Sequence, residues 1–308
     1  MPKRRQIAPL SETAFARRAA DLRAFIQASV PPFPAETREK QRLRIERARL
    51  DREFFLQTYF PHKAEDKTPA FHLLIDQAAM ARRAAVQVFR GGAKTTRAFV
   101  LGALHDAAFG AEEYVQYFTA TDDLAEAKLD LVKAEVETNP RLHHDFPELA
   151  PGEIWRSDRI IVGDLCLDAL GLGSAYRGMT DHKGRRPTKV IVDDPDEDER
   201  VESDVQRTKL RNKILKAVLP GLHPHRGKIL ILGTAMHPEC AIQFFMNDES
   251  YQDWLRVDIP AEGPDGALAW PERFSRPVLD EIMVTLGPSG YSSEYLNQPI
   301  DPQTRELL

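Results

Sequence analysis

The chain has 308 residues, of which 42% are hydrophobic and 29% are charged, and its formal net charge at pH 7 is −5. These proportions exclude an intrinsically disordered chain and are typical of a globular protein with one large domain or two ordinary ones. There is no run of about 18 apolar residues, and the basic N-terminus leads into no apolar segment, so we expect a cytoplasmic protein without a membrane-spanning helix. The two cysteines, Cys166 and Cys240, fit neither a disulfide framework nor a zinc site.

The N-terminal part of the chain is basic. Residues 1–52 contain 13 Lys and Arg against 6 Asp and Glu, a net charge of +7, which leaves −12 for the rest of the chain. The pattern predicts two helices here, over 12–29 and 37–59, with the proline-rich breaker 30–34 between them. Charge of one sign at one end of a chain is typical of contact with an anionic partner such as nucleic acid, although a solvated helix surface gives the same pattern.

The second predicted helix, 37–59, has an apolar side. Leu43, Leu50 and Phe54 fall on it and would hold the helix against the core. If the basic sides contact DNA or an acidic neighbouring subunit, that contact should weaken steeply with salt. Those sides carry five arginines: Arg42, Arg44, Arg47, Arg49 and Arg52.

A phosphate-binding loop is predicted near residue 90. An apolar strand over 86–89 enters a glycine pair, and a buried helix over 98–104 follows. Small residues let backbone N–H groups close on an anion, a lysine reaches terminal phosphates, and a hydroxyl binds magnesium. The standard spacing would place glycines at Val88 and Ala93, so an ordinary strand-to-helix turn is the alternative. The residues that could hold a nucleotide are Gly91, Gly92, Ala93, Lys94, Thr95 and Thr96.

Further strands and helices alternate along the chain, which favours an α/β fold with a parallel sheet covered on both faces. Ligands of such sheets bind at the carboxyl ends of the strands, so the loop, Asp193, Asp194 and Thr234 should meet at one edge. The predicted elements are a strand over 113–119, a helix capped by Thr121 and ending near 139, a strand or hairpin over 160–170, a strand over 189–193, a helix from Ser203 with a capping box to Gln206, and a strand over 229–233.

Acidic residues follow the strand that ends at Asp193: six of the seven residues 193–199 are Asp or Glu. After a phosphate loop, such a strand suits nucleotide hydrolysis. Asp193 and Thr95 would hold magnesium, and Asp194 would orient or deprotonate the attacking water, with Glu197 as the other candidate for that base. A solvated acidic turn or an unrelated divalent-metal site is the alternative.

Three further residues are candidates for phosphate chemistry. Arg90 and Arg177 could neutralise charge in the transition state, or could be surface arginines. Thr234 could sense the terminal phosphate, or its hydroxyl could cap the next helix.

Together these motifs resemble the ATPase half of the large terminase subunit, the motor that packages double-stranded DNA into tailed-phage capsids. The resemblance runs from about residue 50 to the end. It rests on the loop 89–96, the acidic strand 190–195 and the segment 233–238, with support from Asn139-Pro140, 176–178 and 291–299.

The resemblance implies a RecA-like P-loop ATPase with a mostly parallel central sheet covered by helices on both faces. It places an N-terminal helical appendage at 1–60, the ATPase domain at 61–300, and the start of a linker at 301–308. The family's nuclease domain would follow that linker, so we expect this chain not to cut DNA.

In the family, an arginine of the phosphate loop takes part in ATP turnover, which corresponds to Arg90, and a stretch before the loop contacts adenine, which points to Phe71 and His72. The implied cofactors are ATP and Mg²⁺. The implied partners are double-stranded DNA, the portal protein, the small terminase subunit and further copies of the chain in a ring, a pentamer by resemblance, with a monomer in isolation. The expected location is the host cytoplasm, with no membrane contact.

Three other functions fit parts of the sequence. A helicase-like motor would need a second lobe of about 150 residues, and the chain after Thr234 is too short for one. A metal-dependent nuclease could use the acids at 193–199. A DNA-binding or assembly module could have kept only the fold.

Overall fold

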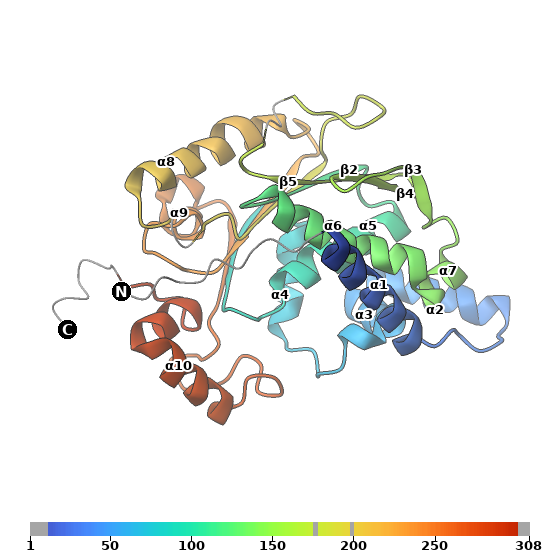
Figure 1. Cartoon of the computed structure of the whole chain (residues 1–308), viewed down its shortest axis with the longest axis horizontal. Coiled ribbons are helices and arrows are strands. Elements are labelled where there is room, and N and C mark those ends of the chain that lie inside the picture. Colours follow the sequence, from blue (N-terminus) through green and yellow to red (C-terminus); the bar gives the residue numbers. More distant parts are fainter. Residues whose placement is uncertain (1–11, 175–177, 198–199, 301–308) are drawn as a thin grey trace.

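A single eight-stranded sheet runs through the computed structural model, which describes residues 12–174, 178–197 and 200–300 and the side chains from residue 17 onward (Figure 1). The strand order is β3-β4-β5-β2-β6-β7-β1-β8, and only the pairs β3–β4 and β4–β5 are antiparallel. The predicted α/β fold with a mostly parallel sheet is therefore confirmed. The strands are β1 (Arg83–Val88), β2 (Tyr114–Thr119), β3 (Pro151–Trp155), β4 (Arg159–Val162), β5 (Leu165–Gly171), β6 (Lys189–Asp193), β7 (Lys228–Gly233) and β8 (Leu255–Ile259).

Helices cover both faces of the sheet, as predicted. Side chains of α3 to α6 pack in one hydrophobic cluster, and those of α9 and the turn after α8 pack in a second cluster on the other face. The helices are α1 (Glu12–Ser29), α2 (Arg38–Leu50), α3 (Arg52–Tyr59), α4 (Phe71–Met80), α5 (Gly102–Phe109), α6 (Asp122–Thr138), α7 (Pro140–Asp145), α8 (Asp204–Lys213), α9 (Ala241–Asn247) and α10 (Arg276–Glu294). A π turn at Thr96–Leu101 leads directly into α5, and another at Ile214–Val218 directly follows α8.

The central strands are apolar on both sides because both sides are buried. In β6, Val190 and Val192 point into one cluster and Ile191 into the other. The parallel register pairs Asp193 with Leu232 of β7, and Gly233 with Gln87 of β1. The carboxyl ends of β1, β6 and β7 therefore lie at the same edge of the sheet.

The predicted single helix over 37–59 is wrong, because the chain breaks at Asp51. This residue has extended backbone angles and caps α3, its carboxylate accepting a hydrogen bond from the N–H of Phe54 at 2.8 Å. The break resets the helical phase, so a face counted across it is not continuous. Leu43 and Leu50 are 55% and 86% exposed, and α2 instead buries Ala48 in the core.

Helix α3 belongs to the main core. Phe55, Leu56 and Tyr59 are buried in the same cluster as the residues of α4 and α5. The predicted domain boundary at residue 60 thus coincides with no break in packing, and the division into 1–60 and 61–300 stays a prediction. The segment 301–308 lies outside the described residues.

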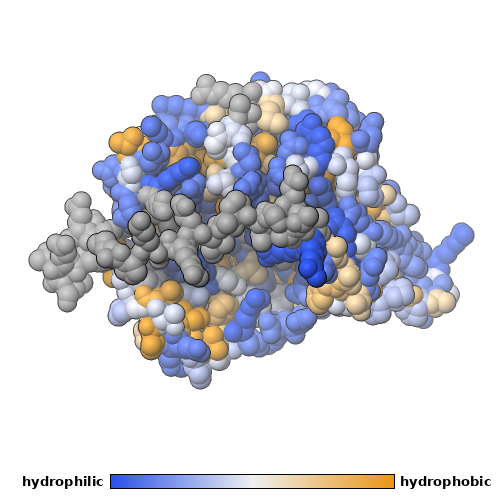
Figure 2. Space-filling model, viewed as in Figure 1, coloured by the Kyte–Doolittle hydropathy of each residue, from blue (hydrophilic) through white to orange (hydrophobic). Residues whose placement is uncertain are grey.

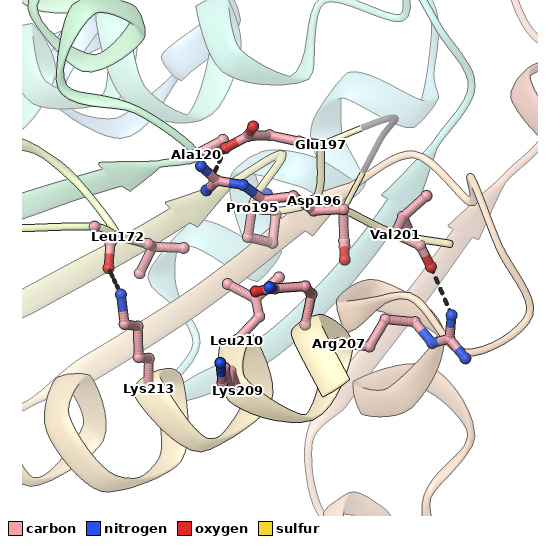
Figure 3. A pocket seen from close by; sticks show the side chains of 13 residues that line it. Ala120, Leu172, Pro195, Asp196, Glu197, Val201, Arg207, Lys209, Leu210 and Lys213 are labelled. Carbon is pink, nitrogen blue, oxygen red and sulfur yellow. Dashed lines mark hydrogen bonds and ion pairs between the residues drawn. The ribbon is translucent and has the colours of Figure 1, made fainter. Parts of the chain in front are cut away.

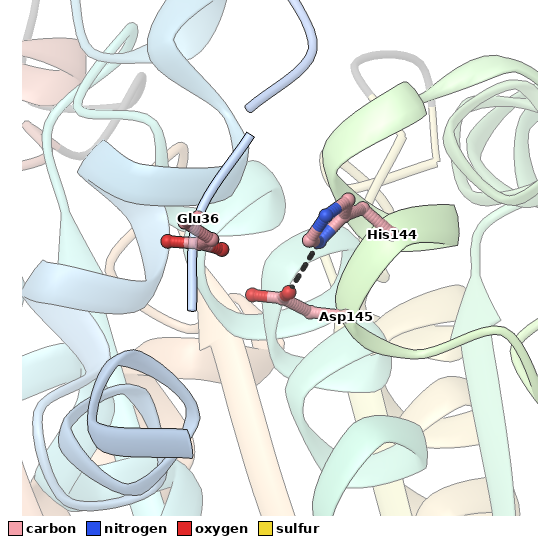
Figure 4. A group of neighbouring side chains, drawn as sticks. All are labelled: Glu36, His144 and Asp145. Carbon is pink, nitrogen blue, oxygen red and sulfur yellow. Dashed lines mark hydrogen bonds and ion pairs between the residues drawn. The ribbon is translucent and has the colours of Figure 1, made fainter. Parts of the chain in front are cut away.

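A cluster of acidic and imidazole groups at the start of α2 is structural. In Figure 4, Asp145 lies between Glu36 and His144, close enough together to suggest a metal site. However, Arg44 pairs with Glu36 at 2.5 Å and with Asp145 at 2.7 Å, and Tyr59 donates a further hydrogen bond to Asp145. The two carboxylates thus share one guanidinium, and these contacts tie α2 to α7.

Ser203 is the N-cap residue of α8, as predicted, but the predicted capping box is wrong. Within the described part of the chain, the Ser203 hydroxyl makes no capping hydrogen bond. Arg207 instead holds the first turn by pairing with Asp204 and with Glu239 of the segment before α9.

Helix α10 lies at the side of the molecule and is kinked at Gly287, whose φ is +73° and which precedes Pro288. Its first half exposes several apolar side chains, which form an orange patch at the lower left of Figure 2: Val278, Met283, Val284 and Leu286. Within the described ranges, no helix is both long and apolar enough to cross a membrane.

Acid should destabilise the fold through His105 of α5. The ring is buried between Phe55 and Phe109, and burial, with the charges of Arg52 and Lys189, lowers the pKa of His105 to about 4 despite nearby Asp106. The unfolded chain binds this proton near the ordinary value of 6.5. Between these values the unfolded state binds more protons, so stability should fall as the pH falls from 6.5 to about 4, by at most about 3 kcal/mol.

Urea unfolding across this pH range would measure the effect. The variant His105→Gln lacks the titrating group, so its free energy of unfolding should fall less over the same interval than that of the wild type. Because the other titrating groups are common to both proteins, the difference between the two curves isolates His105. Parallel curves would contradict the assignment.

Candidate functional site

Three neighbouring strand ends form the candidate site. The loop 89–95 follows β1, Asp193 and Asp194 end β6, and Thr234 follows β7, which lies between the other two strands. Lys94 is the centre of the arrangement: its Nζ lies 2.9 Å from Oδ2 of Asp194 and donates to the Thr234 hydroxyl at 3.0 Å. The structure thus brings together residues that are 140 positions apart in sequence.

The loop has the backbone of an anion-binding turn. Gly91 and Ala93 have φ values of +84° and +62°, and such left-handed residues let successive N–H groups point into one concave site. A Cβ atom at Gly91 would lie 2.8 Å from the ring of Phe274, and one at Gly92 would lie 2.6 Å from Val88. Packing therefore requires glycine at both positions.

Asp193 fits a magnesium ligand. Its Oδ2 accepts hydrogen bonds from the hydroxyls of Thr95 at 2.5 Å and Tyr117 at 2.7 Å, whereas its buried Oδ1 has no hydrogen-bond partner among the described residues. Burial and the charge of Asp194 raise the pKa of Asp193 to about 6. A buried carboxylate oxygen left free beside a threonine hydroxyl is a ligand set that Mg²⁺ accepts.

Tyr117 is a site residue that the sequence did not reveal. It lies on β2, which pairs with β6, and its ring stacks on Phe99 of the helix after the loop at a centroid distance of 3.9 Å. Burial, and the charge of Asp193, raise the pKa of Tyr117 well above its ordinary value, so the hydroxyl stays protonated and donates. Only the strand order, which places β2 beside β6, could have indicated it.

The acids after Asp193 separate in space. Asp194 is half exposed at the loop and has a φ of +42°, a strained angle for a residue other than glycine. Asp196 instead accepts a hydrogen bond from the N–H of Ala241, at the start of α9, at 2.9 Å. Burial raises the pKa of Asp196 to about 6. Glu197 pairs with Arg200 at 2.9 Å.

Glu197 belongs to a different cavity. Figure 3 shows it with Asp196 on the wall of a hollow of about 120 Å³ between α8 and the ends of β2 and β5. Basic side chains of α8, among them Lys209 and Lys213, form the opposite wall. Of the two predicted bases, only Asp194 contacts the phosphate loop.

The predicted arginines lie apart from Lys94 or beyond the described residues. Arg90 is about half exposed, and its guanidinium pairs with Glu294 of α10 at 2.7 Å, while its N–H donates to the Glu294 carbonyl at 2.8 Å. Arg177 lies outside the described residues. Thr234 is not a helix cap, because α9 starts seven residues later, at Ala241, after Cys240.

A cavity of about 320 Å³ adjoins the loop on the side of α4. His72 lines it, but Phe71 does not: Phe71 is buried against Phe89 and Trp270. The His72 Nε2 lies 3.1 Å from the Gly92 carbonyl, and burial lowers the pKa of this histidine to about 4, so its ring is neutral. Trp270 also lines the cavity, so an aromatic ring and a neutral imidazole lie on its wall beside the loop.

The loop on one parallel strand, carboxylates two strands away and a hydroxyl between them define a RecA-like fold. No known protein-family model matches the chain, and no curated protein matches its sequence. The large terminase ATPase domain of Thermus phage P74-26 superposes on 81% of this chain and 98% of its own, with a TM-score of 0.55 at 19% identity. An arginine-to-alanine variant of that domain gives the same coverage, with a TM-score of 0.54 at 18% identity. The fold of this chain is thus that of the large terminase ATPase domain, as the motifs implied.

Proposed function

We propose that this chain is a magnesium-dependent ATPase and the motor domain of a phage large terminase, which moves double-stranded DNA into a procapsid. The observation that carries the proposal is the convergence of Lys94, Thr95, Asp193, Asp194 and Thr234 at one edge of the sheet. The likeness in fold to terminase ATPase domains supports the choice among nucleotide-hydrolysing motors.

Each loop residue has a role in this proposal. The N–H groups of 91–95 and the Lys94 ammonium hold the phosphates. Thr95 and the free Oδ1 of Asp193 hold Mg²⁺, which neutralises phosphate charge when bound. The base of the nucleotide lies beside the neutral ring of His72 and against Trp270, so we assign the adenine contact to His72 and not to the buried Phe71.

Lys94 and Asp194 exchange partners in the proposed cycle. In the structure the two side chains form an ion pair at 2.9 Å. When Lys94 turns to the phosphates, the Asp194 carboxylate is released and can accept a proton from the attacking water. Thr234 is hydrogen-bonded to Lys94, so its position depends on whether the lysine is paired with Asp194 or with the phosphates.

Partners follow from the same proposal. Double-stranded DNA, the portal protein and the small terminase subunit would meet a ring of these chains in the host cytoplasm. Arg90 must leave Glu294 to reach a phosphate of its own subunit, and a neighbouring subunit could instead donate the arginine that completes the site. Loss of such a charge costs about 10³-fold or more in related chemistry, so an isolated chain should turn over slowly.

Purified protein tests the proposal. We expect ATP hydrolysis that needs magnesium, is stopped by a chelator, and rises more than proportionally with protein concentration as subunits associate. Supercoiled plasmid should stay intact. Nicking without nucleotide would favour a nuclease at 193–199, and binding of DNA without any hydrolysis would favour an assembly module.

Replacing Tyr117 by phenylalanine should weaken magnesium binding without preventing nucleotide binding. The hydroxyl is one of two donors that hold Oδ2 of Asp193 and so fix the direction of Oδ1. Loss of a partner that orients a metal ligand costs about 10- to 100-fold in metal affinity. Calorimetric titration of the ADP-bound protein with Mg²⁺ or Mn²⁺ measures this loss directly, and the magnesium needed for half-maximal hydrolysis should rise in parallel.

Tyr114→Phe is the matched control. Tyr114 lies on the same strand, is equally buried, and also donates its hydroxyl to a buried aspartate, Asp168, far from the loop. Its loss should lower stability about as much as the loss of the Tyr117 hydroxyl and leave the magnesium titration unchanged. Equal metal affinity in the two variants would show that Tyr117 has only a structural role.

A further inference from the structure

The opposite edge of the sheet, where β1, β6, β7 and β8 begin, holds a hollow of about 390 Å³, which we call the basal cleft. Four chain segments meet there. Arg82 and Arg83 precede or begin β1, Arg186 precedes β6, residues of the segment 219–227 precede β7, and Tyr251 and Trp254 lie before β8. The cleft is separated from the phosphate loop by the length of β1, about 20 Å.

The charge of the basal cleft is positive and poorly neutralised. Among the described residues that line it, none carries a carboxylate, whereas the two cavities beside the loop and beside α8 both contain acidic side chains. The Arg82 guanidinium has no partner in the described part of the chain, and Arg186 donates only to the Pro220 carbonyl, at 3.1 Å. Arg83 lies 3.7 Å from the exposed Asp253, a loose surface pair.

The walls of the cleft are rigid and partly aromatic. Trp254 is buried and stacks on Phe245 at a centroid distance of 5.2 Å, and Tyr251 packs against both rings. The arginines therefore project from fixed strand starts around an apolar floor. A surface of this kind suits a ligand whose anionic groups can reach more than one arginine at once.

The basic N-terminal helix offers less free charge than its sequence suggests. Arg44 is consumed by its two carboxylates and lies 3.8 Å above the ring of Phe33. The guanidinium of Arg47 lies over Phe54, and that of Arg49 over Phe109. All three side chains cover apolar surface, and carboxylates offset the charge of Arg44, whereas Arg47 and Arg49 are exposed and keep theirs.

We propose that the basal cleft binds the phosphodiester backbone of DNA. The forked donors of arginine match phosphate oxygens, and backbone contacts of this kind position a duplex without reading its sequence, as a motor requires. In this arrangement the duplex lies across the mouth of the cleft, with the phosphates of one strand at Arg82 and Arg186. Because the nucleotide site is at the other edge, both ligands bind at once. The choice of DNA rests on the proposed function.

The test is DNA binding by the full chain across a salt series, measured by fluorescence anisotropy with a labelled duplex of random sequence. The double variant Arg82→Gln/Arg186→Gln should bind on the order of 10- to 100-fold more weakly near 0.1 M salt. Its plot of log affinity against log salt should be shallower by about 0.9 for each phosphate that the variant no longer neutralises. Arg82→Gln alone, which removes a side chain without a partner, guards against a folding defect and should show about half of the change in slope.

Arg38→Gln/Arg42→Gln is the charge-matched control, since both arginines are exposed on α2. It should bind DNA as the wild type does. Wild-type affinity of the cleft variant, equal weakening of the two double variants, or binding of polyglutamate as tight as that of DNA would each overturn the proposal. Magnesium-dependent ATP hydrolysis without DNA should be unchanged in all variants. If that hydrolysis is absent from the wild type, the proposed function is wrong. If hydrolysis is intact and the cleft variant binds DNA as the wild type does, only the proposal that the cleft binds DNA is wrong.

Discussion

Replacing Lys94 by alanine should reduce ATP hydrolysis by about 10³-fold or to background, because one preorganised charge aimed at the transferring phosphoryl group contributes an effect of this size. The fold should survive. Lys94 is buried, but its partner Asp194 is about half exposed, so the carboxylate left behind by the substitution can still be hydrated. Turnover by a coupled assay and thermal unfolding of the same samples measure both effects.

Lys213→Ala is a suitable control for Lys94→Ala. The Lys213 ammonium also donates a hydrogen bond, to the Leu172 carbonyl at 2.8 Å, but it faces the cavity beside α8. This variant loses the same charge and should keep full activity. If Lys94→Ala hydrolyses ATP at the wild-type rate with unchanged stability, the loop does not bind phosphate and the ATPase proposal is wrong.

Asp194→Asn should lower the turnover number by about 10²- to 10⁴-fold, the contribution of a general base, while nucleotide binding is kept. Asparagine tolerates the left-handed backbone angle found at this position, so the variant should fold. Glu197→Gln is the comparison. It removes a carboxylate that Arg200 already holds in another cavity, and it should leave turnover within about 2-fold of the wild type.

Single-turnover hydrolysis measures the effect of each substitution on the chemical step, without a contribution from product release. Nucleotide affinity, followed by a fluorescent ADP analogue, should be similar in both variants and the wild type. A result in which only Glu197→Gln abolishes hydrolysis would reverse the assignment and would require the segment around 197 to move toward Lys94 when ATP binds.

Much of the sheet could be predicted because the parallel strands are buried on both faces. Segments such as 229–233 are apolar at every position, and this signal does not depend on distant parts of the chain. Strand β8 gave no such signal: it is an edge strand, in which buried Val257 lies between the charged residues Arg256 and Asp258. Helix α10 was missed for another reason, since Gly287 and Pro288 interrupt its pattern.

The candidate site was predictable where function depends on residues next to a strand end. Lys94, Thr95, Asp193 and Asp194 each follow an apolar strand, so local patterns could locate them. Tyr117 could not be found in this way, because its role comes from the neighbour that β2 acquires in the sheet. The same limit applies to Asp51: an aspartate can continue a helix or cap one, and only the packing of α3 decides between them.

Helix α10 and the phosphate loop are held together at two points. Arg90 binds Glu294 through both its side chain and its N–H, and the ring of Phe274, just before α10, closes against Gly91. A displacement of the loop would therefore pull on both ends of the segment 274–294. Gly287 divides that segment into two helical parts, and the part that follows Phe274 carries the exposed apolar side chains Val278, Met283, Val284 and Leu286.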